Sequence, residues 1–176
     1  MTQTPSAPYA TTPGRTVPVK RTGGSGAAIW AMGGLFEHLV GAGDTNGELA
    51  VSLVTQPPGT GSPLHVHTRE AEAWYLLEGS MNYLAGGELF HLAAGDFIYL
   101  PRDVPHAFRV TGSAPARFLG LTLPGGLMDL YDEVGVPADE RRLPDRGVSA
   151  EEIARWNELG PRYGLRVVGP PIPPAG

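Results

Sequence analysis

The sequence predicts an all-β fold of the sandwich or barrel class, with two short helices after the last strand. Glycine and proline are abundant, with 25 and 18 copies among 176 residues, and both are spread between short apolar runs. These runs recur at spacings of about 8–12 residues, which is typical of many short strands joined by turns. The length suits one domain with a substantial core.

Residues 27–124 are expected to hold the strands and to form the barrel. The run at 48–55 alternates apolar and polar residues, as a half-buried strand does. Gly86 and Gly87 separate two such runs and predict a hairpin. The preceding residues 1–26 are rich in Thr, Pro, Ser and Gly, so we expect a flexible N-terminal arm. The expected strands are Ala27–Met32, Leu35–Val40, Glu48–Thr55, Glu72–Leu77, Met81–Leu84, Glu88–Leu92, Phe97–Leu100, His106–Val110 and Arg117–Leu123.

Residues 125–176 are expected to form two helices and a Pro-rich tail that pack on the barrel, with a weak strand in the tail at Leu165–Val168. The first helix is predicted by an apolar stripe at helical spacing, made of Leu127, Leu130, Tyr131 and Val134. Ser149 and Glu152 form a capping box that predicts the start of the second helix. The apolar stripe of that helix is Ile153, Trp156 and Leu159.

Composition and charge limit the function classes. The net charge of −5 argues against a nucleic-acid-binding face, and the absence of cysteine excludes disulfides and thiolate ligands. The first residues lack the charged start and apolar core of a signal peptide. No apolar run approaches the roughly 20 residues that span a membrane. We therefore expect a soluble cytoplasmic protein with no nucleic-acid or membrane partner.

A candidate metal site begins at His65 and His67, with Glu72 five positions later. On a strand, alternate residues project from one face, so the two imidazoles can share one ion. A third imidazole is expected from the stretch 95–106, which ends at His106. Nitrogen and oxygen ligands of this kind suit one divalent transition metal, with Ni, Co, Fe, Mn and Zn all acceptable.

The first of these stretches resembles the first cupin motif. Its pattern is glycine, five residues, His-x-His, four residues, glutamate, six residues and glycine. Gly59, His65, His67, Glu72 and Gly79 fill every named position.

The second stretch is similar to the second cupin motif, with Gly95, Pro101 and His106 in place. Asp103 stands where that motif usually has glycine, and Val110 where it often has asparagine. Aspartate tolerates left-handed turns better than most residues, and position 110 makes no metal contact in the motif.

The resemblance implies a cupin double-stranded β-helix, a jelly-roll barrel, with its metal ligands pointing inward. By the match these ligands are His65, His67, Glu72 and His106. Alternation along the strands then turns Trp74 and Phe108 inward as an apolar wall, which is the usual character of a small-molecule pocket. We expect substrate contacts from Trp74, Phe108, Leu127, Met128 and Tyr131.

Within the cupins, the layout resembles the small single-domain quercetinase-type dioxygenases. The similarity covers roughly residues 30–170 and is carried by HVHTREAEAWYLLEG, by GDFIYLPRDVPHAF and by the helical tail. It implies that Glu72 is both ligand and catalytic base and removes the proton of a flavonol-like aromatic enol. Dioxygen then opens the ring with loss of carbon monoxide. The resemblance also implies a homodimer.

Several alternatives remain open at this point. An oxygen-independent cyclase or isomerase acting on a polyketide or β-dicarbonyl would use the same site, because fold does not settle function. A non-enzymatic cupin that binds a small molecule, or a barrel that keeps the pattern without a functional metal, would also fit. Glu70 is the alternative carboxylate, expected as a solvated charge on the rim. His38 and His91 are expected to be paired or surface side chains.

Overall fold

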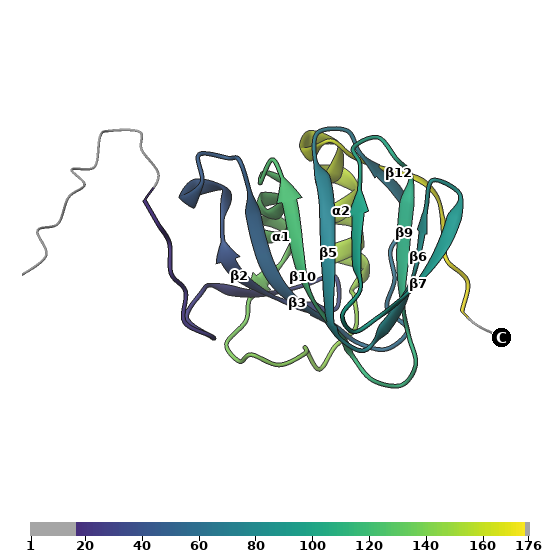
Figure 1. The fold of residues 1–176 in the computed structure, drawn as a ribbon, viewed down its shortest axis with the longest axis horizontal. Helices are drawn as coiled ribbons and strands as arrows, with labels where there is room; N and C mark the ends of the chain where they lie inside the picture. The colour runs from purple at the N-terminus through teal and green to yellow at the C-terminus, as the bar shows by residue number, and fades with distance from the viewer. Residues whose placement is uncertain (1–16, 175–176) are drawn as a thin grey trace, which may run out of the picture.

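Two antiparallel sheets form the body of the protein in a computed structural model, which describes residues 17–174 (Figure 1). A seven-stranded sheet has the order β11-β1-β2-β3-β10-β5-β8, and a five-stranded sheet has the order β12-β4-β9-β6-β7. The predicted all-β class is confirmed. The strands are β1 (Ala28–Ala31), β2 (Gly34–Val40), β3 (Ala50–Gln56), β4 (Pro63–His67), β5 (Ala71–Glu78), β6 (Ser80–Ala85), β7 (Glu88–Ala93), β8 (Phe97–Leu100), β9 (His106–Thr111), β10 (Ala116–Leu123), β11 (Val136–Pro137) and β12 (Leu165–Pro171).

The strand order is that of a jelly roll. β3 lies beside β10 and β4 beside β9, so strands far apart in sequence are neighbours while the two sheets face each other. Residues that alternate along a strand therefore point either between the sheets or out to solvent. In β3 every second side chain is buried, from Ala50 through Ser52 and Val54 to Gln56.

The predicted hairpin between β6 and β7 is present. Gly86 and Gly87 both have positive φ, 59° and 89°, which two-residue turns of this kind require and glycine allows without strain.

The main core lies between the sheets and is rich in aromatic side chains. Trp74 stacks on Phe118 with ring centroids 4.1 Å apart and meets Phe108 edge-on at 5.0 Å. Tyr83 and Leu76 are among its most completely buried members. These rings are fixed from several sides, so they form a rigid wall rather than a mobile lining.

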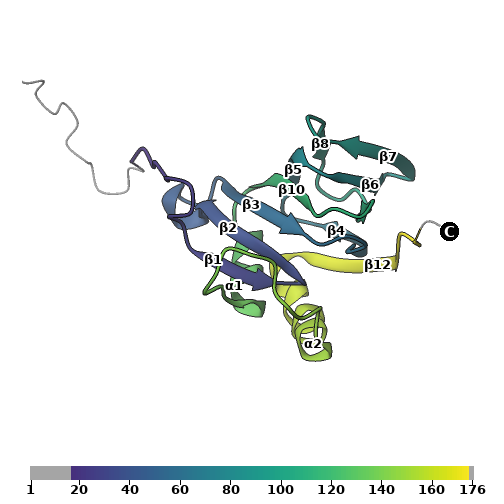
Figure 2. The same cartoon turned by 90° about the horizontal axis from the view of Figure 1, so that it is seen from below.

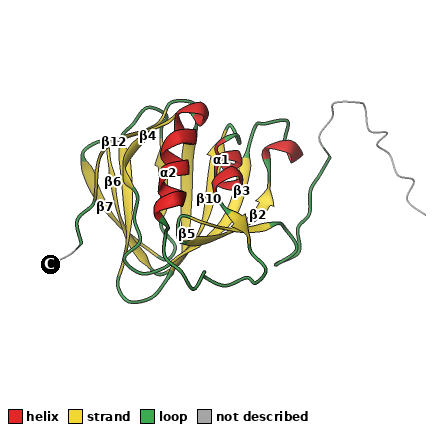
Figure 3. Cartoon of the chain, turned by 180° about the vertical axis from the view of Figure 1, so that it is seen from behind, coloured by secondary structure: helices red, strands yellow, loops and turns green. Residues whose placement is uncertain are grey.

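Two helices follow the last barrel strand, as predicted: α1 (Leu127–Val134) and α2 (Ala150–Leu159). They lie on the same side of the sheets (Figures 2 and 3). A second apolar cluster joins the two helices to the start of β12 and is made of Leu127, Leu130, Val134, Trp156, Leu159 and Leu165. Among the helices of residues 17–174, none is long and apolar enough to cross a membrane.

The start of α2 differs in part from the predicted capping box. Ser149 Oγ accepts a hydrogen bond from the Glu152 backbone N–H at 3.1 Å, as expected. The Glu152 carboxylate instead accepts a hydrogen bond from the backbone N–H of Met32, and so fastens α2 to the β1–β2 turn. Ile153, expected in the apolar stripe, is 45% exposed. The buried residues of α2 are Trp156 and Leu159.

The C-terminal segment contributes strands as well as helices. β12 pairs with β4, the strand that carries two of the candidate metal ligands, and β11 pairs with β1. The segment therefore completes both sheets in addition to packing on them. Most of the expected N-terminal arm, residues 1–16, lies outside the described residues, and the described remainder up to residue 26 forms no strand.

Candidate metal centre

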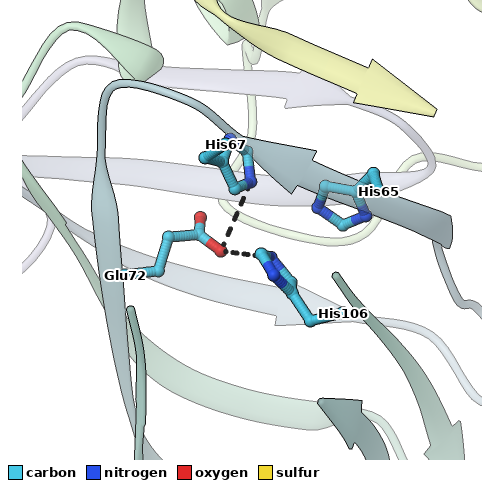
Figure 4. Close-up of side chains that lie close together, drawn as sticks. All are labelled: His65, His67, Glu72 and His106. Carbon is cyan, nitrogen blue, oxygen red and sulfur yellow. Dashed lines mark hydrogen bonds and ion pairs between the residues drawn. The ribbon is translucent and has the colours of Figure 1, made fainter. Parts of the chain in front are cut away.

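Four side chains from three strands meet between the two sheets (Figure 4). β4 carries His65 and His67 on one face, and β9 places His106 directly opposite His65 in the strand register. Glu72 comes from β5 in the other sheet. One possible ligand atom from each residue lies within 4.8 Å of the corresponding atom of the others.

The carboxylate faces two of the three imidazoles. Glu72 Oε2 lies 3.2 Å from His106 Nε2 and 3.6 Å from His67 Nε2. The centroid of the His65 ring lies 4.4 Å from that of His106. Three imidazoles and a carboxylate therefore converge on one small volume.

Backbone carbonyls orient two of these rings. The Nδ1–H of His65 donates to Pro63 O, and that of His106 donates to Val104 O, both at 2.8 Å. A proton held on Nδ1 leaves the Nε2 lone pair directed into the cluster, which is how metal-binding histidines are commonly held.

His67 supplies the clearest sign that the cluster suits a cation. It is 2% exposed, and neither of its ring nitrogens finds a hydrogen-bond partner in the described part of the chain. Burying an imidazole without partners is costly, whereas a bound metal would satisfy it. The donor set of three nitrogens and one carboxylate thus fits a divalent transition metal.

The loop before His106 shows why the departure from the second motif is tolerated. Asp103 adopts φ of 64°, the left-handed conformation that the usual glycine would take. Its backbone N–H donates to His67 O at 2.9 Å and ties the loop to the end of β4. The substitution therefore keeps the geometry that presents His106.

Burial and mutual charge separate the pKa values of the four groups. Burial, reinforced by the neighbouring His106 and His67, lowers the pKa of His65 to about 3, and burial also lowers that of His67. For His106, burial acts downward, but the hydrogen bond and charge of Glu72 outweigh it and raise the pKa. Burial disfavours the Glu72 carboxylate, yet His67 and His106 hold its pKa at about 2.

These shifts predict how metal affinity depends on pH. A metal needs neutral imidazoles, and His106, whose pKa is raised above its ordinary 6.5, is the first to take a proton as pH falls. His65 and His67 stay neutral at that stage because their pKa values are lowered. We expect the dissociation constant to rise about tenfold per pH unit below the His106 pKa, with one proton taken up per ion released. Calorimetric titration in buffers of different ionisation enthalpy measures this proton number, and a value of two or three would contradict the assignment.

Two cavities adjoin the cluster. The front cavity, of about 90 Å³, is lined by His65, Glu72 and Tyr83 and reaches Trp156 of α2 and Val167 of β12. The inner cavity, of about 40 Å³, lies toward α1 and β3, and Glu72 lines it too. Both cavities share the side chains that separate them: Gln56, Glu72, Trp74, Phe108 and Tyr131.

The expected substrate residues fall in three places. Trp74, Phe108 and Tyr131 line both cavities, and Met128 lines the inner one. Leu127 is fully buried in the second apolar cluster, outside the lining of both cavities. A substrate contact from Leu127 stays a prediction, and the function proposed below does not use it.

Other lining residues were not expected from the sequence. Tyr83 and Gln56 continue the inward alternation of β6 and β3, but the expected third strand stopped at residue 55, one residue too early to include Gln56. Trp156 and Val167 reach the front cavity because the C-terminal segment folds back against β4, a long-range contact that alternation within a strand cannot reveal.

The alternative carboxylate and the two other histidines of the described chain also have defined places. Glu70 is 4% exposed rather than solvated, and burial raises its pKa to about 7, but it lies outside the metal cluster. His91 pairs with Asn82 through a 2.7 Å hydrogen bond on the surface. His38 pairs with Ser52 and Asp132.

Comparison with known proteins supports the jelly-roll fold. Residues 52–122, which include all four candidate ligands, match the protein-family model described as Cupin domain. A predicted oxalate decarboxylase from Thermotoga maritima is 23% identical, with a TM-score of 0.54 over 61% of this chain and 99% of that chain. Oxalate decarboxylase from Bacillus subtilis is 25% identical, with a TM-score of 0.54 over 69% of this chain and 32% of that chain.

A sugar phosphate isomerase of the cupin superfamily from Silicibacter pomeroyi is 28% identical, with a TM-score of 0.44 over 52% of this chain and 59% of that chain. A search of curated protein sequences finds no match. The fold is thus a jelly roll that is similar to the cupin structures it matches, with a buried cluster suited to a metal ion.

Proposed function

We propose that the protein is a metal-dependent cupin enzyme that acts on a neutral aromatic enol, as a dioxygenase of the quercetinase kind. The proposal is carried by one observation: a polar metal centre lies beside a cavity whose walls carry aromatic side chains. A cluster of three imidazoles and a carboxylate opens onto a cavity walled by aromatic side chains. Such a cavity suits a flat apolar molecule that offers one polar edge to the ion.

Charge in the front cavity argues against small anionic substrates. None of the described residues that line it is lysine or arginine. Oxalate, the substrate class named for two structural neighbours, carries two negative charges. A divalent metal held by Glu72 would offset only one of them, and no basic side chain among the described lining residues pairs with the other. A neutral enol needs no such partner.

The roles of the side chains follow from their positions. A bound metal would supply a Lewis acid that lowers the pKa of an enol hydroxyl. Glu72, which is ionised at neutral pH because its pKa is held at about 2, accepts the hydroxyl proton. Trp74 and Phe108 flank the space beside Glu72 and hold an aromatic ring there by stacking and edge contacts.

Tyr83 is expected to bind the substrate's polar edge. Tyr83 lines the front cavity, and its buried hydroxyl has no hydrogen-bond partner within residues 17–174. Burial keeps the pKa of Tyr83 well above its ordinary value, so the hydroxyl is a neutral donor. We expect Tyr83→Phe to raise KM about threefold to tenfold, the worth of one hydrogen bond, while the melting temperature stays the same or rises. A lower melting temperature with unchanged KM would assign the hydroxyl to the fold instead.

The size of the front cavity favours a second candidate. Its volume of about 90 Å³ is small beside the 300 Å³ or more typical of drug-sized ligands. A flavonol therefore requires Trp156 and neighbouring side chains at the mouth to move outward, whereas a compact β-dicarbonyl does not. An oxygen-independent cyclase or isomerase acting on such a compound is the alternative function.

Oxygen consumption separates the two candidates. Metal-loaded protein is incubated with a flavonol, a compact cyclic β-dicarbonyl and oxalate, while dissolved oxygen and substrate absorbance are recorded together. The dioxygenase predicts equal loss of flavonol and oxygen, and the alternative predicts loss of the β-dicarbonyl without oxygen uptake. Turnover of oxalate in preference to both enols would contradict the proposal.

A further inference from the structure

A chain of hydrogen bonds runs from the protein surface to the inner cavity without touching the candidate ligands. Asp132 Oδ1, on α1, lies 2.8 Å from His38 Nε2, and His38 Nδ1 lies 2.9 Å from Ser52 Oγ. Exposure falls along this chain, from 51% for the Asp132 side chain to 14% for that of His38 and 1% for Ser52. The three residues therefore connect solvent with the interior.

Ser52, at the inner end of this chain, lines the inner cavity, and Glu72 lines the same cavity. Two more polar side chains line that cavity, Gln56 and Thr122, which are 3% and 4% exposed. Gln56 Oε1 and Thr122 Oγ1 find no hydrogen-bond partner in the described chain, although buried polar atoms are nearly always paired.

Water would satisfy these unpaired atoms. A cavity needs roughly 10–15 Å³ for each water molecule, and each water needs two to four polar partners. The inner cavity, of about 40 Å³, has room for two or three, and Ser52, Gln56, Thr122 and Glu72 supply the partners.

We propose that water in the inner cavity links Glu72 to Ser52, His38 and Asp132, and that this path carries protons between the metal centre and the surface. The inference rests on the proposed function, in which Glu72 receives the proton of the substrate. A substrate in the front cavity covers that side of Glu72, and a second route on the far side lets its proton exchange with solvent while the substrate is bound.

The hydroxyl of Ser52 has the two acceptors that such a relay needs. His38 Nδ1 lies 2.9 Å from Ser52 Oγ, and Met128 Sδ lies 3.1 Å from it. With Nδ1 unprotonated, Ser52 donates to His38. With Nδ1 protonated, His38 donates to Ser52, and the hydroxyl turns toward Met128 or the cavity.

An outgoing proton passes from cavity water to Ser52 Oγ as the hydroxyl proton of Ser52 moves to His38 Nδ1. The proton on His38 Nε2 then passes to Asp132, whose exposed carboxylate releases it to solvent. His38 is left with its proton on Nδ1, and it regains the starting tautomer by exchanging that proton with solvent for one on Nε2, so each cycle moves one proton outward.

Ser52, His38 and Asp132 do not act as a nucleophilic triad, because a substrate cannot reach the Ser52 hydroxyl. Ser52 lines the inner cavity only, whose volume of about 40 Å³ admits water but no ester or amide substrate.

The experiment compares His38→Gln and Ser52→Ala with wild-type protein, all loaded with metal. We expect kcat to fall roughly tenfold with KM and metal content unchanged, and the solvent deuterium effect on kcat to increase. Ser52→Thr, which retains a hydroxyl, should recover most of the lost kcat. His91→Gln, at a surface histidine that also has a polar partner, is the matched control and should leave kcat unchanged.

A high-resolution crystal structure supplies a readout that does not need turnover. We expect ordered water bonded to Thr122 Oγ1 and Gln56 Oε1 in the wild type. A dry inner cavity, or unchanged kcat in His38→Gln, would overturn the relay. Absence of turnover with every enol, in metal-loaded protein whose inner cavity is hydrated, would count against the proposed function instead.

Discussion

Replacing His67 with alanine is expected to weaken metal binding by roughly a hundredfold or more. His67 is buried, and no described residue bonds to either of its ring nitrogens. Its removal therefore takes one of three imidazoles from the ion, and the fold loses no internal hydrogen bond of that ring. We also expect the metal to raise the melting temperature of the wild type by roughly 5–10 °C at a hundredfold excess over its dissociation constant, and that of His67→Ala by no more than about 1–2 °C at the same metal concentration.

His91→Ala is the matched control for this variant. His91 is a surface histidine in the same sheet, paired with Asn82 and remote from the cluster. The His91→Ala protein should bind metal like the wild type, as measured by elemental analysis after dialysis and by thermal unfolding with and without metal. Undiminished metal binding in His67→Ala would remove this residue from the site.

Glu72→Gln is expected to lower kcat by about 10²–10⁴-fold, the usual worth of a positioned general base. The amide keeps the size of the side chain but cannot take a proton. The low pKa of Glu72, about 2, makes it a weak base, so the proton transfer depends on the metal lowering the pKa of the enol as well. The rate is measured at saturating metal, since three imidazoles remain to hold the ion.

Glu70→Gln is the control for Glu72→Gln. It shows whether a loss of kcat comes from losing the base or from losing any buried carboxylate. Glu70 lies two residues before Glu72 and is also buried, but outside the cluster. Its raised pKa of about 7 means that the amide replaces a group that is already partly neutral at pH 7. We expect this variant to keep wild-type kcat and metal content, and equal losses in both variants would refute a specific role for Glu72.

The parts of this protein that follow local rules could be predicted from its sequence. Alternating patterns located strands such as β3 and β6 to within a few residues, because one face of each is buried, whereas β11 was not predicted. The stripe from Leu127 to Val134 located α1, and Ser149 located the start of α2. Motif spacing brought together four residues that the structure places within 4.8 Å of one another.

Long-range contacts explain most of what could not be predicted. The pairing of β12 with β4 brings Val167 to the front cavity, and no local pattern in the Pro-rich tail indicates that partner. The pairing of His38 with Asp132 joins β2 to α1 across 94 positions of sequence. Glu70 looked like a surface charge because polarity alone does not reveal that its side chain is buried.

The position of the bound metal tests the central claim most directly. Crystals of protein saturated with Zn or Ni are measured on both sides of the metal absorption edge, which locates the ion independently of the protein density. We predict one site, bonded to Nε2 of His65, His67 and His106 and to a carboxylate oxygen of Glu72. An ion bound elsewhere, or no ion at these four residues under saturating metal, would contradict the account.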